Sequence, residues 1–365
     1  MSNMTGMARS APASPPWLRQ GLLHAGGVVL LVIYPLIVPD FWIFQIGGQA
    51  LFLGVISLSL MFLGGYGGMV SLAQMTVAGA AGYTIAIVGG NSLNFGLLLP
   101  WWAAVPIAIA VATAVATVIG AISVRTEGIY TIMITIAIAM AFFYFAQQNY
   151  SIFNGHSGFA SVLPPTVFGI DWRTPIPFYL LSLATAVLSY SVVLYLSRST
   201  FGIALQAIRD NPRRMRALGF SVTAHRIAAY SIAGFIASLG GILLVWFNSR
   251  ISPGTVSAGP IFDVLVIAVL GGMRHPIGPF VGAVIFVLLQ NFAIDFIDRE
   301  RFNTLIGACF LAIVLFSPDG VLGLWARLVA LVNRAGAANR MFERPIDTGS
   351  SIQPTAIGRL IQGRR

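Results

Sequence analysis

The chain has 365 residues, of which 57% are hydrophobic and only 9% are charged. An average soluble domain carries about 25% charged residues, so this composition excludes an ordinary soluble protein and predicts a polytopic membrane protein. The formal net charge of +10 would suggest a nucleic-acid partner in a soluble protein. Here the basic residues gather in loops and in the C-terminal tail, so membrane topology explains the charge and we expect no nucleic-acid partner.

All basic side chains are arginines, because the sequence contains no lysine. A Walker A loop requires lysine beside serine or threonine, so the chain does not hydrolyse ATP by that route. The single cysteine, Cys309, lies in an apolar run and is expected to be a packing residue. The few histidines show no metal-binding spacing, so the sequence predicts neither a catalytic residue nor a metal site.

Residues 1–20 are rich in alanine, proline and serine and are predicted to form a disordered cytosolic N-terminus. Residues 21–334 form the predicted all-α transmembrane domain. Residues 335–365 form a basic cytosolic tail that is disordered or lies on anionic lipid. Most of the apolar runs in the domain approach the roughly 20 residues that cross a bilayer. They predict about ten spans: Leu22–Val38, Ile46–Leu63, Met69–Val88, Leu98–Ser123, Ile129–Gln147, Ile176–Ser197, Ile227–Phe247, Ile261–Leu270, Ile277–Ile294 and Phe302–Phe316.

The arginines predict the orientation of these spans. Only Arg173, Arg250, Arg299 and Arg301 of the 21 basic residues fall on one side, and cytosolic loops carry the excess of positive charge. Both termini are therefore expected in the cytosol. The short run at 261–270 either forms a half-helix or extends into its flanks. The longest outer loop, residues 149–175, either shapes an entrance or meets a partner, or is an ordinary polar connection.

Residues 198–226 form the most strongly charged stretch between two spans, with six arginines and the single acid Asp210. One interpretation is a positive-inside loop that only sets topology. The other is a docking surface for a cytosolic partner, and the signs of a defined fold in this stretch favour it.

Those signs are local. Ser199 or Thr200 can cap a helix over Phe201–Asp210. Proline suits the first turn of the next helix, about Pro212–Leu218. Gly219 then supplies the left-handed residue that commonly ends a helix. The stretch is therefore predicted to be a pair of short helices.

Few ionisable groups lie within the spans. Asp263 and Asp295 are placed near outer ends, whereas proton- or sodium-coupled carriers often keep carboxylates deep in the membrane. Neutral polar residues instead follow a glycine-rich break at 64–68. Ser71, Gln74 and Thr76 either line a transport path or stabilise helix packing, and Tyr83 follows on the same run. A second glycine break, at 271–272, echoes the first.

These stretches together resemble the membrane permease of ABC importers for branched-chain amino acids, and more closely the longer of that system's two paired permeases. The resemblance covers roughly residues 60–325. It departs from the family at 155–158 and at Arg274–His275. It rests on GGYGGMVSLAQMTVAGAAGYT at Gly64–Thr84, RTEGIY at Arg125–Tyr130 with Thr135, FGIALQAIRDNPRRMRALGF at Phe201–Phe220, the region Ile251–Ala283, and FSPDGVLGLW at Phe316–Trp325.

The resemblance implies an importer subunit in a bacterial inner membrane, with no cofactor of its own and with ATP bound by separate cytosolic ATPase subunits. It also implies a second permease subunit and an extracytoplasmic substrate-binding protein as partners, besides membrane lipid. Related permeases carry urea, short amides or aromatic acids. A secondary carrier or a membrane scaffold is the remaining alternative. The implied ATPase-coupling residues are Gly202, Ala204, Ala207, Arg209, Arg213, Arg214 and Gly219, and the substrate-path candidates are Ser71, Gln74, Thr76, Tyr83 and Thr135.

Overall fold

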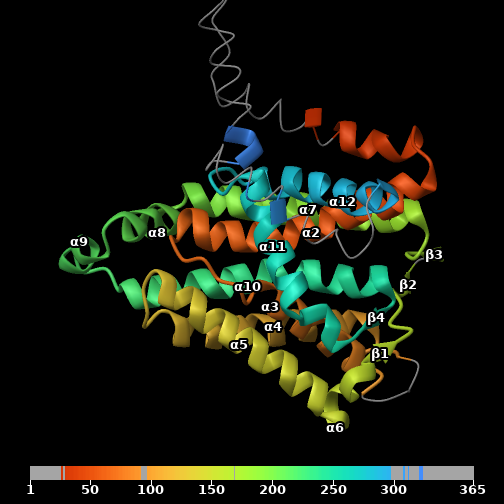
Figure 1. Cartoon of the computed structure of the whole chain (residues 1–365), viewed down its shortest axis with the longest axis horizontal. Coiled ribbons are helices and arrows are strands. Elements are labelled where there is room, and N and C mark those ends of the chain that lie inside the picture. Colours follow the sequence, from red (N-terminus) through yellow and green to blue (C-terminus); the bar gives the residue numbers. More distant parts are fainter. Residues whose placement is uncertain are drawn as a thin grey trace, which may run out of the picture. The chain divides into compact units, whose positions relative to one another are not determined.

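The structure, a computed structural model, describes residues 26–27, 29–91, 97–167, 169–296, 307–308, 311 and 320–323. The chain divides into two units, Met1–Gly323 and Leu324–Arg365. Only the first contains described residues, and the tail predicted at 335–365 lies outside them. In the described residues the first unit is almost entirely helical (Figure 1), which confirms the predicted all-α class.

The helices follow the apolar runs of the sequence. Five are long and apolar enough to cross a membrane, and Gln74–Val88, Ala258–Gly271 and Gly278–Phe292 are shorter apolar helical segments. The first of the five, Trp42–Tyr66, is continuous and consists of π-helical turns η2 and η3 on either side of α2. The helical elements are η1 (Tyr34–Leu36), η2 (Trp42–Gly48), α2 (Gln49–Met61), η3 (Phe62–Tyr66), α3 (Gln74–Val88), α4 (Trp101–Ser123), α5 (Ile129–Gln148), α6 (Tyr150–Phe153), η4 (Gly155–Ser157), α7 (Pro175–Arg198), α8 (Thr200–Asp210), α9 (Pro212–Ala217), α10 (Val222–Asn248), η5 (Pro253–Val256), α11 (Ala258–Gly271) and α12 (Gly278–Phe296).

The span predicted at Met69–Val88 is wrong at its start. Its helix, α3, begins only at Gln74 and has 15 residues. Gly68 has a left-handed φ of +66°, a conformation that interrupts a right-handed helix. Residues 67–73 are therefore an irregular connection between η3 and α3. The short segment at Ile261–Leu270 extends to α11, which has 14 residues. The run at Leu22–Val38 is described in part, and most of Phe302–Phe316 lies outside the described residues.

Helices α2, α3 and α10 form the centre of the unit, and glycines bring their backbones together. A Cβ atom on Gly241 of α10 would lie 2.1 Å from the carbonyl oxygen of Ala78 in α3. A Cβ atom on Gly240 would lie 2.5 Å from Ile56 of α2. Small residues permit this close approach of helices in membranes. The most apolar stretch of the helix Trp42–Tyr66 is 83% buried by the rest of the described chain, whereas that of α5 is 22% buried. Trp42–Tyr66 is therefore a central helix and α5 a peripheral one.

Two connections pair at one end of the unit. Strand β1 (Phe159–Ala160) pairs antiparallel with β4 (Arg250–Ile251), with Phe159 opposite Ile251. Strand β2 (Thr166–Val167) pairs antiparallel with β3 (Ile170–Asp171). The predicted outer loop at 149–175 is thus an ordered connection bound to the segment after α10. We call this the loop end.

The opposite end carries α8 and α9. Helix α7 runs from β3 at the loop end to α8, and α10 returns from α9 to β4. The two short helices stand together away from the strands (Figure 1). We call the pair α8–α9 the hairpin, and its end of the unit the hairpin end.

Candidate coupling and transport sites

Helix α8 begins at Thr200, one residue before its predicted start, and Ser199 is the cap. The Ser199 side-chain oxygen accepts a hydrogen bond from the Gly202 amide at 3.3 Å, which satisfies a donor that the helix cannot pair itself. A Cβ atom on Gly202 would lie 1.9 Å from the carbonyl oxygen of Leu196 in α7. Glycine therefore allows α8 to leave α7 at a sharp turn.

Helix α9 is held by local contacts as well. The Asn211 side-chain oxygen accepts a hydrogen bond from the Arg214 amide at 2.9 Å, and Pro212 occupies the first turn. Gly219 has a φ of +88°, which confirms the predicted left-handed end. The helix itself ends at Ala217, one residue before the predicted end.

A small apolar core joins the two helices. It contains Ala204, Ile208, Met215 and Val222, with Ala207 packed against it. The predicted coupling residues Gly202, Ala204 and Ala207 therefore lie inside or against the hairpin and shape it. They do not form its outer surface.

The outer surface of the hairpin is basic and apolar. Arg213, Arg214 and Arg216 are exposed, and Ile203 and Leu218 are 60% and 65% exposed. We call these five residues the docking face. Arginine with exposed apolar side chains suits a protein interface, because its guanidinium binds carboxylates with two parallel hydrogen bonds.

Arg209 differs from the arginines of the docking face. Its Nη1 donates a hydrogen bond to the carbonyl oxygen of Gly65 at the end of η3. Its Nε donates to Asp210 Oδ1 at 3.0 Å. The family resemblance implied that Arg209 contacts the ATPase subunits. In the structure its side chain contacts the chain's own glycine-rich break instead.

The five substrate-path candidates are all buried within the chain; they are Ser71, Gln74, Thr76, Tyr83 and Thr135. Ser59 Oγ donates to Gln74 Oε1 at 3.0 Å. Thr135 Oγ1 accepts from the Leu72 amide at 3.1 Å. These two candidates therefore hold the connection at 67–73 and the start of α3 in place.

Thr76 and Tyr83 differ from these two because their buried hydroxyl groups make no hydrogen bond. The Tyr83 ring packs edge-on against Phe153, with centroids 5.0 Å apart, and lies within 6.5 Å of Phe142 and Phe159. A buried hydroxyl without a partner is costly. Thr76 and Tyr83 are therefore the candidates whose hydrogen-bonding capacity is not used by the described part of the chain.

One ion pair near the hairpin was not predicted from the sequence. Arg226 in the first turns of α10 lies 3.5 Å from Glu127, the residue before the Gly128 turn that precedes α5. Its side chain is 11% exposed, whereas that of Glu127 is 65% exposed. The feature that could have indicated it is Glu127 itself, an acidic residue in a predicted cytosolic turn between two spans. This ion pair connects α10 to the segment between α4 and α5.

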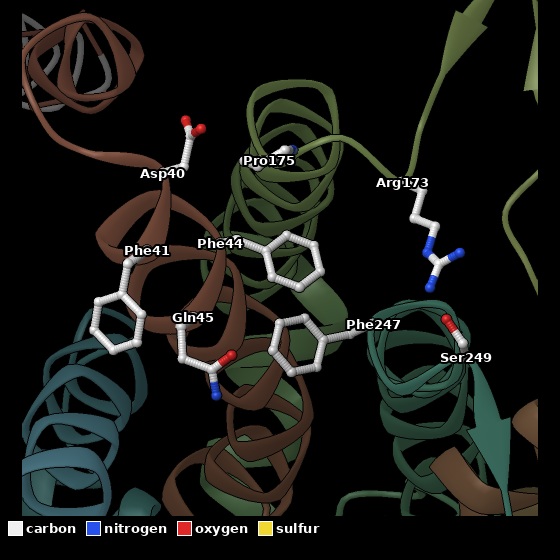
Figure 2. A pocket seen from close by; sticks show the side chains of 8 residues that line it. All are labelled: Asp40, Phe41, Phe44, Gln45, Arg173, Pro175, Phe247 and Ser249. Carbon is white, nitrogen blue, oxygen red and sulfur yellow. The ribbon is translucent and has the colours of Figure 1, made fainter.

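A hollow of about 400 Å³ opens at the loop end. Its rim carries Asp40 on one side and Arg173 on the other, with phenyl rings between them (Figure 2). Phe44 and Phe247 stack there with centroids 4.7 Å apart. This site could not be predicted from the sequence, because its residues come from separate segments: Asp40, Phe41, Phe44, Gln45, Arg173, Pro175, Phe247 and Ser249.

The hollow combines both charges with apolar walls. An arginine suits a carboxylate, an aspartate suits an ammonium group, and phenyl rings suit an apolar side chain. In the described part of the chain, no three His, Cys, Asp or Glu side chains gather closely enough to hold a metal ion.

Long apolar helices, a folded basic hairpin at one end and a charged aromatic hollow at the other define a polytopic membrane protein of the transport class. Residues 42–314 match the family described as "Branched-chain amino acid transport system / permease component". The chain belongs to this family.

Its relatives are transport permeases. The chain is 26% identical to the high-affinity branched-chain amino acid transport system permease protein LivM of Salmonella typhimurium, over 80% of this chain and 74% of the relative. It is 25% identical to LivM of Escherichia coli, over 84% and 77%. It is 22% identical to the ribose import permease protein RbsC of Haemophilus influenzae, over 81% and 91%. No solved structure gives a significant match.

Proposed function

We propose that the protein is a permease subunit of an ATP-driven importer for branched-chain amino acids in a bacterial inner membrane. The family match over residues 42–314 carries this proposal. It is supported by the two LivM relatives, which are permease proteins of branched-chain amino acid transport systems. The sequence lacks lysine and hence a Walker A loop, which supports the proposal that separate subunits bind the ATP.

The hairpin end is proposed to face the cytosol, with both termini on that side, because the hairpin carries the largest cluster of arginines between spans. The docking face then meets the cytosolic ATPase subunits. The loop end meets the substrate-binding protein, and a second permease subunit completes the path. The alternating opening of such a path is a two-state change that ATP binding biases.

The hollow at the loop end supports an amino acid as the substrate class. Its Arg173 and Asp40 carry opposite charges around phenyl walls, and a zwitterion with an apolar side chain has the matching groups. We propose that the substrate first contacts this chain there.

Uptake of labelled leucine tests the function. A strain that lacks this chain is compared with the same strain carrying the gene, with ATP depleted or with the membrane potential collapsed. We expect uptake that returns with the gene and depends on ATP but not on the potential.

Dependence on the potential would contradict the proposal and indicate a secondary carrier. No uptake of any solute would indicate a scaffold. Competition with excess ribose, urea, a short amide and an aromatic acid serves as the specificity control. Inhibition by one of these in place of leucine would overturn the substrate assignment while leaving the family unchanged.

A further inference from the structure

Three interruptions of the helical backbone meet at the hairpin end. The first is the glycine-rich break at 64–68, where η3 ends. The second is the turn between α11 and α12, whose Met273 carbonyl oxygen would lie 2.2 Å from a Cβ atom on Gly65. The third is the end of α8, where Arg209 reaches the same glycine. Glycine at position 65 is required because the two backbones touch.

Arg209 binds this junction in two ways. Its guanidinium donates to the Gly65 carbonyl, and the carbonyl groups at the end of a helix are the ones that lack amide partners and attract cations. Its aliphatic stem lies over Gly68, where a Cβ atom would be 2.5 Å from Arg209 Cγ. The side chain is still 40% exposed, so its contacts with Gly65 and Gly68, and not burial, anchor Arg209 to its own chain.

The junction leads directly to the substrate-path candidates. After Gly68 the chain forms the irregular connection to α3, in which the Leu72 amide donates to Thr135 and Gln74 accepts from Ser59. Irregular backbone is tolerated in a membrane where it is buried in protein or lines a cavity. This connection therefore lies in the chain between Gly65 and the buried hydroxyl groups of Thr76 and Tyr83.

We infer that Arg209 is a positioning residue that passes a movement of the hairpin to the glycine-rich break, and so to the connection at 67–73. The inference rests on the proposed function, because the movement originates at ATPase subunits bound to the docking face. It assigns different roles to neighbouring arginines. Arg213 and Arg214 bind the ATPase subunits, and Arg209 passes the resulting movement of the hairpin to the glycine-rich break.

The test uses the full complex in lipid vesicles, with Arg209→Gln compared with the matched variant Arg213→Gln. For Arg209→Gln we expect the ATPase subunits still to co-purify and ATP hydrolysis to persist, while leucine transported per ATP falls about tenfold, a typical size for coupling between sites. Arg209→Lys should recover part of this ratio, because one ammonium can still donate to Gly65. For Arg213→Gln we expect weaker co-purification with an unchanged ratio.

A second readout does not depend on the substrate. In a Cys309→Ser background, Val70→Cys places a thiol on the half-buried connection. Its reaction rate with a maleimide should change on ATP addition with Arg209 present and should not change in Arg209→Gln. Loss of co-purification in Arg209→Gln, or an unchanged ATP response, would overturn the inference. If leucine fails to be transported but the thiol still responds through Arg209, the substrate proposal fails and the inference stands.

Discussion

The two helices of the hairpin carry arginines with opposite surroundings. Arg209 on α8 is fixed between Gly65 and Asp210, whereas Arg213, Arg214 and Arg216 on α9 are exposed. They lie within eight positions of one another in a single basic stretch. Positive charge alone therefore does not identify a docking residue in this stretch. The direction of each side chain decides whether it can reach a partner.

Reversing charge on α9 should give the largest effect. Arg213→Glu combined with Arg214→Glu should remove the ATPase subunits from the purified complex and lower leucine uptake about a hundredfold, because like charges facing each other cost several kcal/mol. Co-purification of the ATPase subunits and the rate of leucine uptake measure these two effects. Arg250→Glu reverses one charge at the loop end and should leave co-purification intact. Equal loss in both variants would contradict a docking role for α9.

Disturbing the anchor on α8 should have a smaller effect. Gly68→Ala places a side chain at a φ of +66°, which costs about 1–2 kcal/mol for an L-residue, and it pushes the Arg209 stem away. We expect leucine uptake to fall about tenfold while the ATPase subunits remain bound.

Gly128→Ala is the matched control, because Gly128 has a similar φ of +63° and a Cβ atom there has no neighbour within 4 Å. A fall in uptake accompanied by loss of the ATPase subunits would show that Gly68 serves the docking face instead.

The smallest effect is expected at the loop end, far from either arginine set. Arg173→Gln removes the cation of the hollow and should raise the leucine concentration for half-maximal uptake about threefold, the scale of an exposed ion pair. The maximal rate and the ATPase co-purification should not change. Arg250→Gln is the control, and a similar shift in both variants would contradict a substrate contact at Arg173.

The sequence predicted the hairpin almost to the residue because its signals are local. Ser199, Asn211 and Pro212 determine the starts of α8 and α9, and each acts within three positions of itself. Local signals were not sufficient at Met69–Val88, because the apolar run begins directly after the glycine-rich break, yet residues 69–73 are not helical. Apolar composition reports membrane burial, but it does not report continuity of the helix.

The direction of Arg209 could not be predicted, because its partner Gly65 lies 144 positions away. The hollow was missed for the same reason, since Asp40 and Arg173 come from segments far apart in the sequence and line one hollow only in the folded chain. The substrate-path residues Ser71, Gln74, Thr76, Tyr83 and Thr135 remain a prediction. The sequence shows that these side chains are neutral and polar. Whether each one binds a solute or a neighbouring helix depends on the tertiary contacts.

The glycine contacts between α3 and α10 restrict the motions available to the protein. Packed helices commonly move by shear, in which one slides a little along another, or by a hinge in a connecting segment. Backbones in direct contact at Gly241 and Ala78 leave no side-chain layer to repack during sliding, and close-packed interiors do not deform continuously. We therefore expect helices α3 and α10 to move as one block, with any hinge in a non-helical segment such as the connection at 67–73.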